Sequence, residues 1–260
     1  MTVILEARRL NKSFGAVTAA ADIDVSVEQD SVVGLIGSNG AGKTTFINMV
    51  TGYLTPTSGQ ILYAGRDITG FKPRQITTLG ICRSFQIPQL FNTLSVSENL
   101  MIGVDIAARS ARGDGAAKGT ERAQVERLID RFNLGGYATQ VASQLPEGVR
   151  KLLDIAMAVA GRPKVLLLDE PTSGVSADEK FRLMDMVMGA LKTEGVTVLF
   201  VEHDMDIVSR YTHRVLAFYE GRIIADGEPG RVLQDAEVRR YVIGEHTQPG
   251  AQREADRAAH

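Results

Sequence analysis

The chain has 260 residues, of which 44% are hydrophobic and 23% charged, and its formal net charge is −2. This composition is typical of one or two globular domains and excludes a mainly disordered chain, and the near-neutral charge excludes a global basic field that would attract nucleic acid. The single cysteine, Cys82, excludes a disulfide framework and fits a reducing compartment.

We expect neither a signal peptide nor a membrane span. The first ten residues lack a charged start followed by a long apolar core. The longest apolar run, Leu152–Ala160, is interrupted by Asp154 and is far shorter than the ~20 residues that a spanning helix needs.

The N-terminal part predicts strands followed by a glycine-rich turn and a helix. The apolar or alternating segments typical of strands are Val3–Leu5, the stretch around Val25 and Val27, and Val32–Ile36. A turn at 37–42 precedes a helix predicted over Lys43–Thr51, which Gly52 should end. Residues 61–65 predict an edge hairpin.

The middle of the chain, from about 87 to 160, is more helical. Its stretch Ala107–Gly119 is rich in Ala, Gly and Arg and predicts a mobile loop. Amphipathic helices are predicted over Glu121–Phe132 and over Val149–Ala160, where apolar residues recur at helical spacing.

The C-terminal part alternates apolar strands with helices. The predicted strands are Val165–Leu168, Val196–Val201 and a hairpin of Val215–Phe218 with Arg222–Ala225, and the predicted helices are Asp178–Leu191 and Asp204–Tyr211. This alternation predicts an α/β domain over 1–244 with a mainly parallel sheet, into which a helical subdomain (about 87–160) is inserted. The polar tail 245–260 predicts disorder.

A phosphate-binding loop is predicted directly after the strand Val32–Ile36. Residues 37–44 match the pattern G-x-x-x-x-G-K-[ST] at every fixed position, between a buried strand and a helix. The glycines let several backbone N–H groups point at phosphate oxygens, and the helix N-terminus adds partial positive charge. Lys43 supplies a full charge to the β- and γ-phosphates, and the Thr44 hydroxyl can ligate Mg²⁺.

Acidic and imidazole side chains follow two later predicted strands. Asp169 and Glu170 end the strand that starts at Val165, and His203 follows the strand that ends at Val201. Ligands of α/β sheets bind at the carboxyl ends of the strands. Asp169 is therefore a candidate Mg²⁺ partner, Glu170 a candidate general base for an attacking water, and His203 a candidate γ-phosphate contact.

Taken together, these residues resemble the nucleotide-binding subunit of an ATP-binding cassette (ABC) transporter, over nearly all of 1–244. The resemblance is closest to the branched-chain amino-acid importer branch, called LivG-like. It rests on Ser38–Thr45, on Arg83–Gln86, on Leu90-Phe91 with Leu94–Leu100, and on Arg240–Gly244. The fold it implies is a P-loop NTPase cassette with a RecA-like core sheet, an antiparallel β-subdomain and the inserted helical subdomain.

The resemblance also implies a role for each site residue. Phe14 would stack on adenine. The residues implied to hold the nucleotide phosphates are Ser38, Asn39, Gly40, Ala41, Gly42, Lys43, Thr44 and Thr45. Thr44, Gln86 and Asp169 would hold Mg²⁺, and Glu170, His203, Gln86 and Lys43 would carry catalysis. The family's signature loop, which covers the γ-phosphate of the opposite subunit, aligns with Leu145, Pro146, Glu147 and Gly148.

Two loops depart from the family pattern. Where the signature loop usually has Leu-Ser-Gly-Gly-Gln, Pro146 removes the serine hydroxyl and Val149 the glutamine, so we expect weaker closure of the site by this loop. Alternatively, the loop is a helix-capping turn without a ligand contact. In the loop after Glu170, Ser176 stands where the family has Asp or Asn, and Ser176 with Glu179 predicts a capping box.

The partners implied by the resemblance are a second ABC ATPase, more readily a LivF-like subunit than a second copy, two transmembrane permeases and, indirectly, a periplasmic solute-binding protein, with no nucleic acid. The expected location is peripheral, at the cytoplasmic face of the membrane. A permease helix would dock in a groove near 87–99. The apolar floor expected there is Pro88, Leu90, Phe91 and Leu94, although these could equally be subdomain core.

Three other functions compete with the importer. A homodimeric lipid- or lipopolysaccharide-export ATPase shares several of the motifs, but it would carry the weak signature loop at both sites. A soluble ABC protein acting on DNA or ribosomes usually has two cassettes or long coiled coils, which this chain lacks. A P-loop kinase or GTPase would not need the pair Asp169 and Glu170 together with His203.

Overall fold

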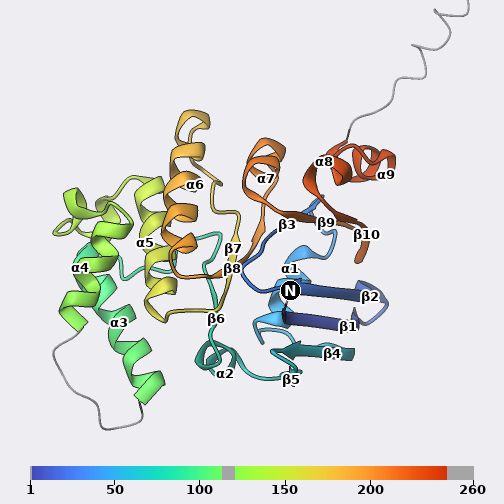
Figure 1. Cartoon of the computed structure of the whole chain (residues 1–260), viewed down its shortest axis with the longest axis horizontal. Coiled ribbons are helices and arrows are strands. Elements are labelled where there is room, and N and C mark those ends of the chain that lie inside the picture. The colour runs from blue at the N-terminus through green and yellow to red at the C-terminus, as the bar shows by residue number, and fades with distance from the viewer. Residues whose placement is uncertain (1, 113–120, 245–260) are drawn as a thin grey trace, which may run out of the picture.

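A computed structural model describes residues 2–112 and 121–244. Two sheets organise these residues: a six-stranded sheet in the order β10-β9-β3-β8-β7-β6, and a four-stranded sheet in the order β2-β1-β4-β5 (Figure 1). All neighbours in the six-stranded sheet are parallel except β9 and β10. The predicted α/β fold with a mainly parallel sheet is therefore confirmed.

The central strands of the parallel sheet are apolar along their whole length. They are β3 (Val32–Gly37), β7 (Val165–Asp169) and β8 (Thr197–Val201), and nearly all of their residues are buried. Parallel strands covered on both faces have such continuous apolar runs. Alternate residues of β7 enter different cores, since Leu166 and Leu168 pack on the helical side and Val165 and Leu167 on the other. The carboxyl ends of these strands meet at one edge of the sheet, which positions the site.

The four-stranded sheet is antiparallel and covers helix α1 (Lys43–Val50). It consists of β1 (Val3–Phe14), β2 (Val17–Glu28), β4 (Ser58–Tyr63) and β5 (Arg66–Asp67). Phe46 and Ile47 of α1 share one hydrophobic core with Leu10 of β1 and Leu35 of β3. The α1 helix is thereby fixed between the two sheets. The strands β1 and β2 extend well beyond the short apolar segments that the sequence predicts.

Helices α3 (Val96–Arg112), α4 (Glu121–Arg131) and α5 (Glu147–Ala160) lie together at the left of Figure 1, with α6 (Ala177–Lys192) beside α5. The loop predicted over Ala107–Gly119 is wrong for 107–112, which continue α3. Alanine and arginine are strong helix formers, and they outweigh the glycine content of this stretch. The rest of that predicted loop lies outside the described residues, as does the tail 245–260.

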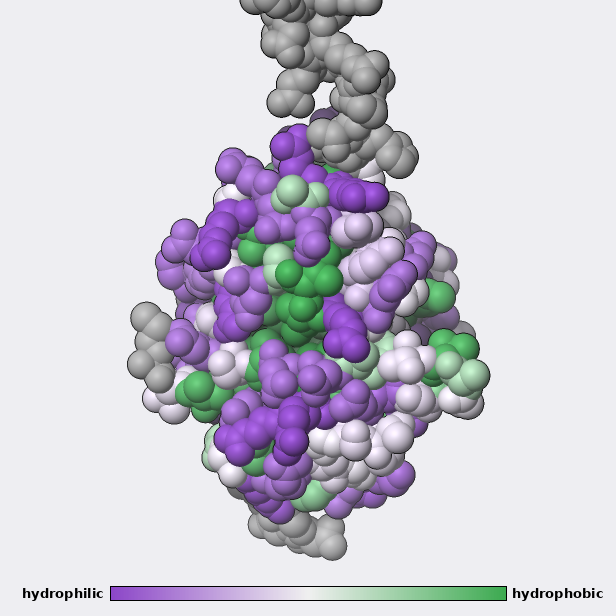
Figure 2. All heavy atoms as spheres, turned by 90° about the vertical axis from the view of Figure 1, so that its right-hand side faces the viewer, coloured by the Kyte–Doolittle hydropathy of each residue, from purple (hydrophilic) through white to green (hydrophobic). Residues whose placement is uncertain are grey.

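The remaining elements connect this framework. They are α2 (Pro73–Thr78), β6 (Ile81–Arg83), the short helices Gly135–Tyr137 and Ala142–Gln144, α7 (Met205–Tyr211), β9 (Arg214–Tyr219), β10 (Arg222–Gly227), α8 (Pro229–Val232), α9 (Ala236–Val238) and a last turn at Arg239–Ile243. On the face in Figure 2, hydrophilic residues surround a central strip of hydrophobic ones. Within 2–112 and 121–244, no helix has the length and apolarity to cross a bilayer.

Candidate nucleotide and catalytic site

The loop between β3 and α1 has the geometry of a phosphate cradle. Gly42 precedes α1 with a φ of 107°, and a Cβ there would lie 2.8 Å from the carbonyl oxygen of Ala19, so glycine is required. Among the residues that the structure describes, no side chain caps the N-terminus of α1. A Cβ at Gly40, which also has a positive φ, would meet nothing within 4 Å, so the loop is open there. The first N–H groups of the helix are thus available to an anion.

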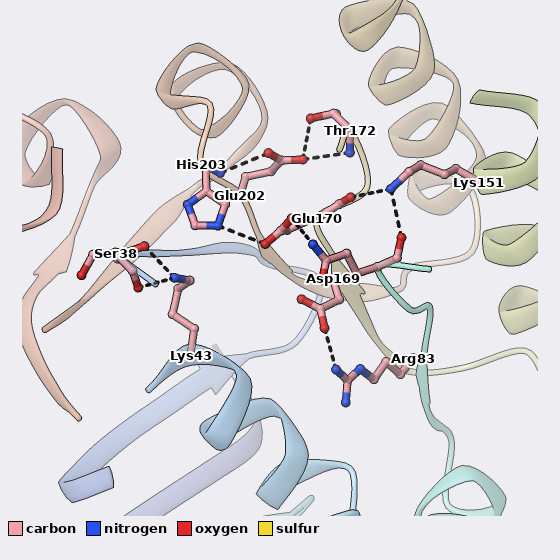
Figure 3. Close-up of polar contacts among 11 residues, drawn as sticks. Ser38, Lys43, Arg83, Lys151, Asp169, Glu170, Thr172, Glu202 and His203 are labelled. Carbon is pink, nitrogen blue, oxygen red and sulfur yellow. Dashed lines mark hydrogen bonds and ion pairs between the residues drawn. The ribbon is translucent and has the colours of Figure 1, made fainter. Parts of the chain in front are cut away.

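The Lys43 side chain lies across this loop. Its ammonium donates to the carbonyl oxygens of Gly37 (2.6 Å) and Ser38 (3.0 Å), and the residue is only 5% exposed (Figure 3). Burial lowers the pKa of the Lys43 ammonium, while the charges of Glu170 and Asp169 raise it. A phosphate that entered the loop would offer this desolvated cation a better partner than two carbonyl groups.

A cavity of about 100 Å³ lies over the loop and joins it to the strand ends. Its lining comprises Asn39, Gly40, Ala41, Gly42, Lys43, Thr44, Thr45, Glu170, Val201 and His203. The fold therefore brings the predicted phosphate loop, the predicted general base and the predicted imidazole into one space.

Glu170 is held by two of the predicted partners. Its Oε1 lies 3.0 Å from His203 Nε2, and its Oε2 accepts a 2.7 Å hydrogen bond from the Gln86 amide (Figure 3 draws Glu170 and His203). Glu170 has a φ of 49°, in the left-handed region. Non-glycine residues in this region cluster at functional sites, where surrounding contacts enforce them.

Asp169 has a partner that sequence reasoning missed. Its Oδ2 lies 2.5 Å from Arg83 Nη2, and both side chains are nearly buried, at 11% and 8% exposed. Arg83 Nη1 also donates to Asn48 of α1 (2.6 Å), and the guanidinium lies 4.9 Å from the ring centroid of Phe85. The feature that could have indicated this pair is that Arg83 ends β6, the strand that pairs with β7, which carries Asp169.

A second missed residue is Glu202, which lies between Val201 and His203 and is 4% exposed. Its Oε1 accepts hydrogen bonds from the Thr172 backbone (2.9 Å) and hydroxyl (2.7 Å), and its Oε2 accepts one from the His203 backbone (3.2 Å). This carboxylate joins the loop after Glu170 to the loop that carries His203. An acid directly before a strand-end histidine was the signal for it.

The proposed magnesium ligands offer oxygen atoms of the kind Mg²⁺ prefers. Thr44 is exposed, so its hydroxyl is free to face a metal beside the phosphates. The Gln86 amide nitrogen faces Glu170, which leaves its carbonyl oxygen as the ligating atom, and Asp169 supplies a carboxylate. The donor types therefore suit Mg²⁺, and Arg83 occupies only one of the two Asp169 oxygens.

The other predicted nucleotide-contacting residues lie outside the cavity. Phe14, at the end of β1, is 52% exposed, with the Lys12 ammonium 5.0 Å from its ring centroid. The Phe14 ring is therefore not part of the hydrophobic core. In the signature-like loop, the Leu145 side chain is buried, Pro146 precedes α5 and Glu147 begins it.

One further sequence prediction is wrong. Ser176 and Glu179 form no capping box, because the Ser176 hydroxyl donates to the Glu179 carboxylate (2.7 Å) and no side chain caps α6. The permease-docking groove expected near 87–99 stays a prediction. A groove of about 330 Å³ lies beside Arg83, and its lining includes Tyr53, Phe85, Gln89, Ile106 and Asp154, but none of Pro88, Leu90, Phe91 or Leu94.

Comparisons with known proteins agree with this geometry. The family model described as "ABC transporter" matches residues 20–173, which include the phosphate loop, Gln86, Asp169 and Glu170. The high-affinity branched-chain amino acid transport ATP-binding protein LivG of Escherichia coli K12 is 32% identical over 250 residues, covering 93% of this chain and 98% of the relative. A probable LivG of Archaeoglobus fulgidus is 34% identical over 246 residues, covering 93% and 95%.

Solved structures match at the level of the whole fold. The ADP conformation of MJ1267, an ATP-binding cassette of an ABC transporter, superposes with a TM-score of 0.82 at 32% identity and covers 94% of this chain and 100% of its own. The structure of cbiO1 from Clostridium perfringens, part of the ABC transporter complex cbiONQ, has a TM-score of 0.81 at 29% identity. The match covers 92% of this chain and 94% of cbiO1. Because the family model covers more than half of the chain and the LivG proteins match nearly all of it, this chain belongs to the ABC transporter ATP-binding family.

Proposed function

We propose that this chain binds ATP with Mg²⁺ and hydrolyses it to power an importer of branched-chain amino acids or similar small organic solutes. The observation that carries the proposal is the contact of Glu170 with both Gln86 and His203 at the cavity of the phosphate loop. The importer assignment is supported by the names of the LivG and BraF relatives.

In the proposed site, the residues of the loop 38–45 bind the phosphates. The N–H groups at the start of α1 and the Lys43 ammonium stabilise negative charge on the transferring phosphoryl group. Thr44, Gln86 and Asp169 would hold Mg²⁺, which would supply positive charge against the phosphates. The adenine stacks on the exposed ring of Phe14.

Glu170 accepts the proton of the attacking water. A carboxylate has about four lone-pair sites, so it can hold the Gln86 and His203 hydrogen bonds and still accept from water. In the tautomer with the proton on Nε2, His203 donates a hydrogen bond to Glu170 and fixes this carboxylate. The His203 ring also lines the cavity, where we assign it the contact with the γ-phosphate.

In this proposal, other subunits of the transporter complete the nucleotide site. The signature-like loop Leu145–Gly148 covers the γ-phosphate of an opposite ATPase, and a LivF-like subunit supplies the equivalent loop to this chain. We assign the helical subdomain to about 87–160. The groove beside Arg83 receives a cytoplasmic helix of one of two permeases, which keeps the chain peripheral at the inner face of the membrane, and a periplasmic protein delivers the solute.

Glu170→Gln tests the hydrolytic mechanism. The amide cannot take the proton of water, so we expect turnover to fall by about 10²–10⁴-fold while ATP still binds. Lys43→Ala should instead weaken ATP binding. Unchanged turnover in Glu170→Gln would remove the general-base role, and normal ATP binding by Lys43→Ala would remove the phosphate site.

A second experiment tests whether the chain powers amino-acid import and which ATPase subunit it pairs with. Proteoliposomes that contain the chain with its permeases and a candidate LivF-like subunit should take up leucine only when ATP and the binding protein are present. Size-exclusion chromatography of Glu170→Gln with ATP gives the oligomeric state. Dimerisation of the chain by itself, without leucine uptake, would favour the homodimeric export ATPase.

A further inference from the structure

Two buried charged side chains of α5 lie between this helix and the segment that carries Gln86. Lys151 is 4% exposed and Asp154 is 7% exposed. They are three residues apart on one helix, so they lie on the same face. Neither belongs to the cavity over the phosphate loop, and Asp154 lines the groove on the other side of the segment.

Asp154 uses both of its oxygens on the backbone around Gln86. Its Oδ2 accepts from the N–H of Phe85 (3.2 Å), and its Oδ1 accepts from the N–H of Gln89 (2.9 Å). Burial raises the pKa of the Asp154 carboxyl, while these two hydrogen bonds and the charge of Lys151 lower it. The carboxylate is thus hydrogen-bonded to the segment one residue before Gln86 and three residues after it.

Lys151 contacts the backbones of both residues whose side chains meet in the site. Its ammonium donates to the carbonyl oxygen of Glu170 (2.9 Å) and to that of Gln86 (3.4 Å), as Figure 3 shows for Glu170. The Gln86 and Glu170 side chains are themselves joined by a 2.7 Å hydrogen bond. Lys151 therefore reaches the left-handed Glu170 backbone, whose conformation needs support from its surroundings.

The cost of burying these charges argues against a role in folding alone. Desolvation lowers the pKa of Lys151, and the carboxylates of Glu147, Glu202, Glu170 and Asp154 oppose it. Replacing a buried charge network by apolar side chains of similar size is often neutral or stabilising for the fold. What an apolar pair could not do is fix three backbone groups of one segment and the carbonyl of Glu170 at defined positions.

We infer that Lys151 and Asp154 are positioning residues that hold the backbones of Gln86 and Glu170 at fixed positions relative to α5. Because α5 begins at the signature-like loop Leu145–Gly148, displacement of that loop shifts the general base through these two side chains. The inference rests on the proposed role of Glu170. It adds that the chemistry of this chain's own site follows the position of its own α5.

The test separates turnover from nucleotide binding and from stability. Lys151→Met keeps the length of the side chain and removes the donor, so turnover should fall at least 10-fold while the Kd for ATP changes less than 2-fold. Asp154 stays buried without the cation beside it, so the urea midpoint should fall, and turnover is measured without urea, where circular dichroism shows that the variant is folded. Lys151→Arg, which keeps a donor, should recover most of the turnover. Lys192→Met, an exposed lysine on α6, is the matched control and should keep normal turnover.

Two further variants make every outcome decisive. If Lys151→Met does not fold, Asp154→Asn carries the same test, and failure of both to fold would overturn the inference in favour of a purely structural role. Wild-type turnover in Lys151→Met, or loss of turnover in step with loss of ATP binding, would also overturn it. Glu170→Gln is measured in parallel: wild-type turnover there refutes the proposed function, whereas a collapse there beside an active Lys151→Met refutes only this inference.

Discussion

Removing the Arg83 guanidinium should destabilise the whole domain, although the residue lies at a strand end. Arg83→Met keeps an unbranched apolar side chain of comparable length and removes three interactions at once. These are the 2.5 Å ion pair with Asp169, the 2.6 Å hydrogen bond to Asn48 and the contact with the Phe85 ring. Asp169 remains behind as a nearly buried carboxylate without its partner.

The expected magnitude follows from burial. Removing one member of a buried ion pair typically costs about 3–5 kcal/mol, because the other charge stays desolvated. The same change at an exposed pair costs about 0.3–0.5 kcal/mol. Arg109 with Asp105 is such a pair on α3, at 79% and 48% exposed, so Arg109→Met is the matched control.

Urea unfolding followed by far-UV circular dichroism measures the difference, since the chain has no tryptophan for fluorescence. With an m-value of about 3 kcal/mol/M, the Arg83→Met midpoint should fall by about 1–1.7 M, and the Arg109→Met midpoint by about 0.2 M or less. If Arg83→Met unfolds within about 0.3 M of the wild type, the pair with Asp169 does not form as described, and the argument fails.

Three other predictions concern single positions. Phe14→Ala should raise the Kd for ATP by about 5- to 150-fold, from a stacking energy of about 1–3 kcal/mol, and leave the Kd for inorganic triphosphate unchanged in calorimetry; an equal loss for both ligands would contradict base stacking. Gly59→Ala should lower the thermal midpoint sharply, because its Cβ would lie 2.2 Å from the Arg9 carbonyl oxygen, whereas Gly230→Ala, with nothing within 4 Å, should leave it unchanged or slightly higher. Burial raises the pKa of Cys82 to about 11, so at pH 8 a disulfide reagent such as Ellman's should label it slowly in the native chain and rapidly in urea; rapid native labelling would contradict its burial.

Some secondary-structure elements could be predicted from the sequence and others could not. The continuous apolar runs of β3, β7 and β8 are local features, so the parallel sheet and the loop 37–44 could be predicted from residue pattern alone. The long strands β1 and β2 could not, because their polar residues are held by pairing across a sheet rather than by their own pattern. Residues 107–112 are helical despite the glycines that follow them, because alanine and arginine have high helix propensity.

Sequence by itself therefore determined which chemical groups this protein has at its strand ends: the phosphate loop with Lys43, the acids Asp169 and Glu170, and the imidazole of His203. The tertiary structure decided what surrounds them. Arg83 faces Asp169 from 86 residues away, and Lys151 reaches Gln86 from 65 residues away. Such contacts depend on which strands are neighbours and on where α5 packs, and a hydrogen bond that joins distant parts of the chain leaves no local pattern in the residues that form it.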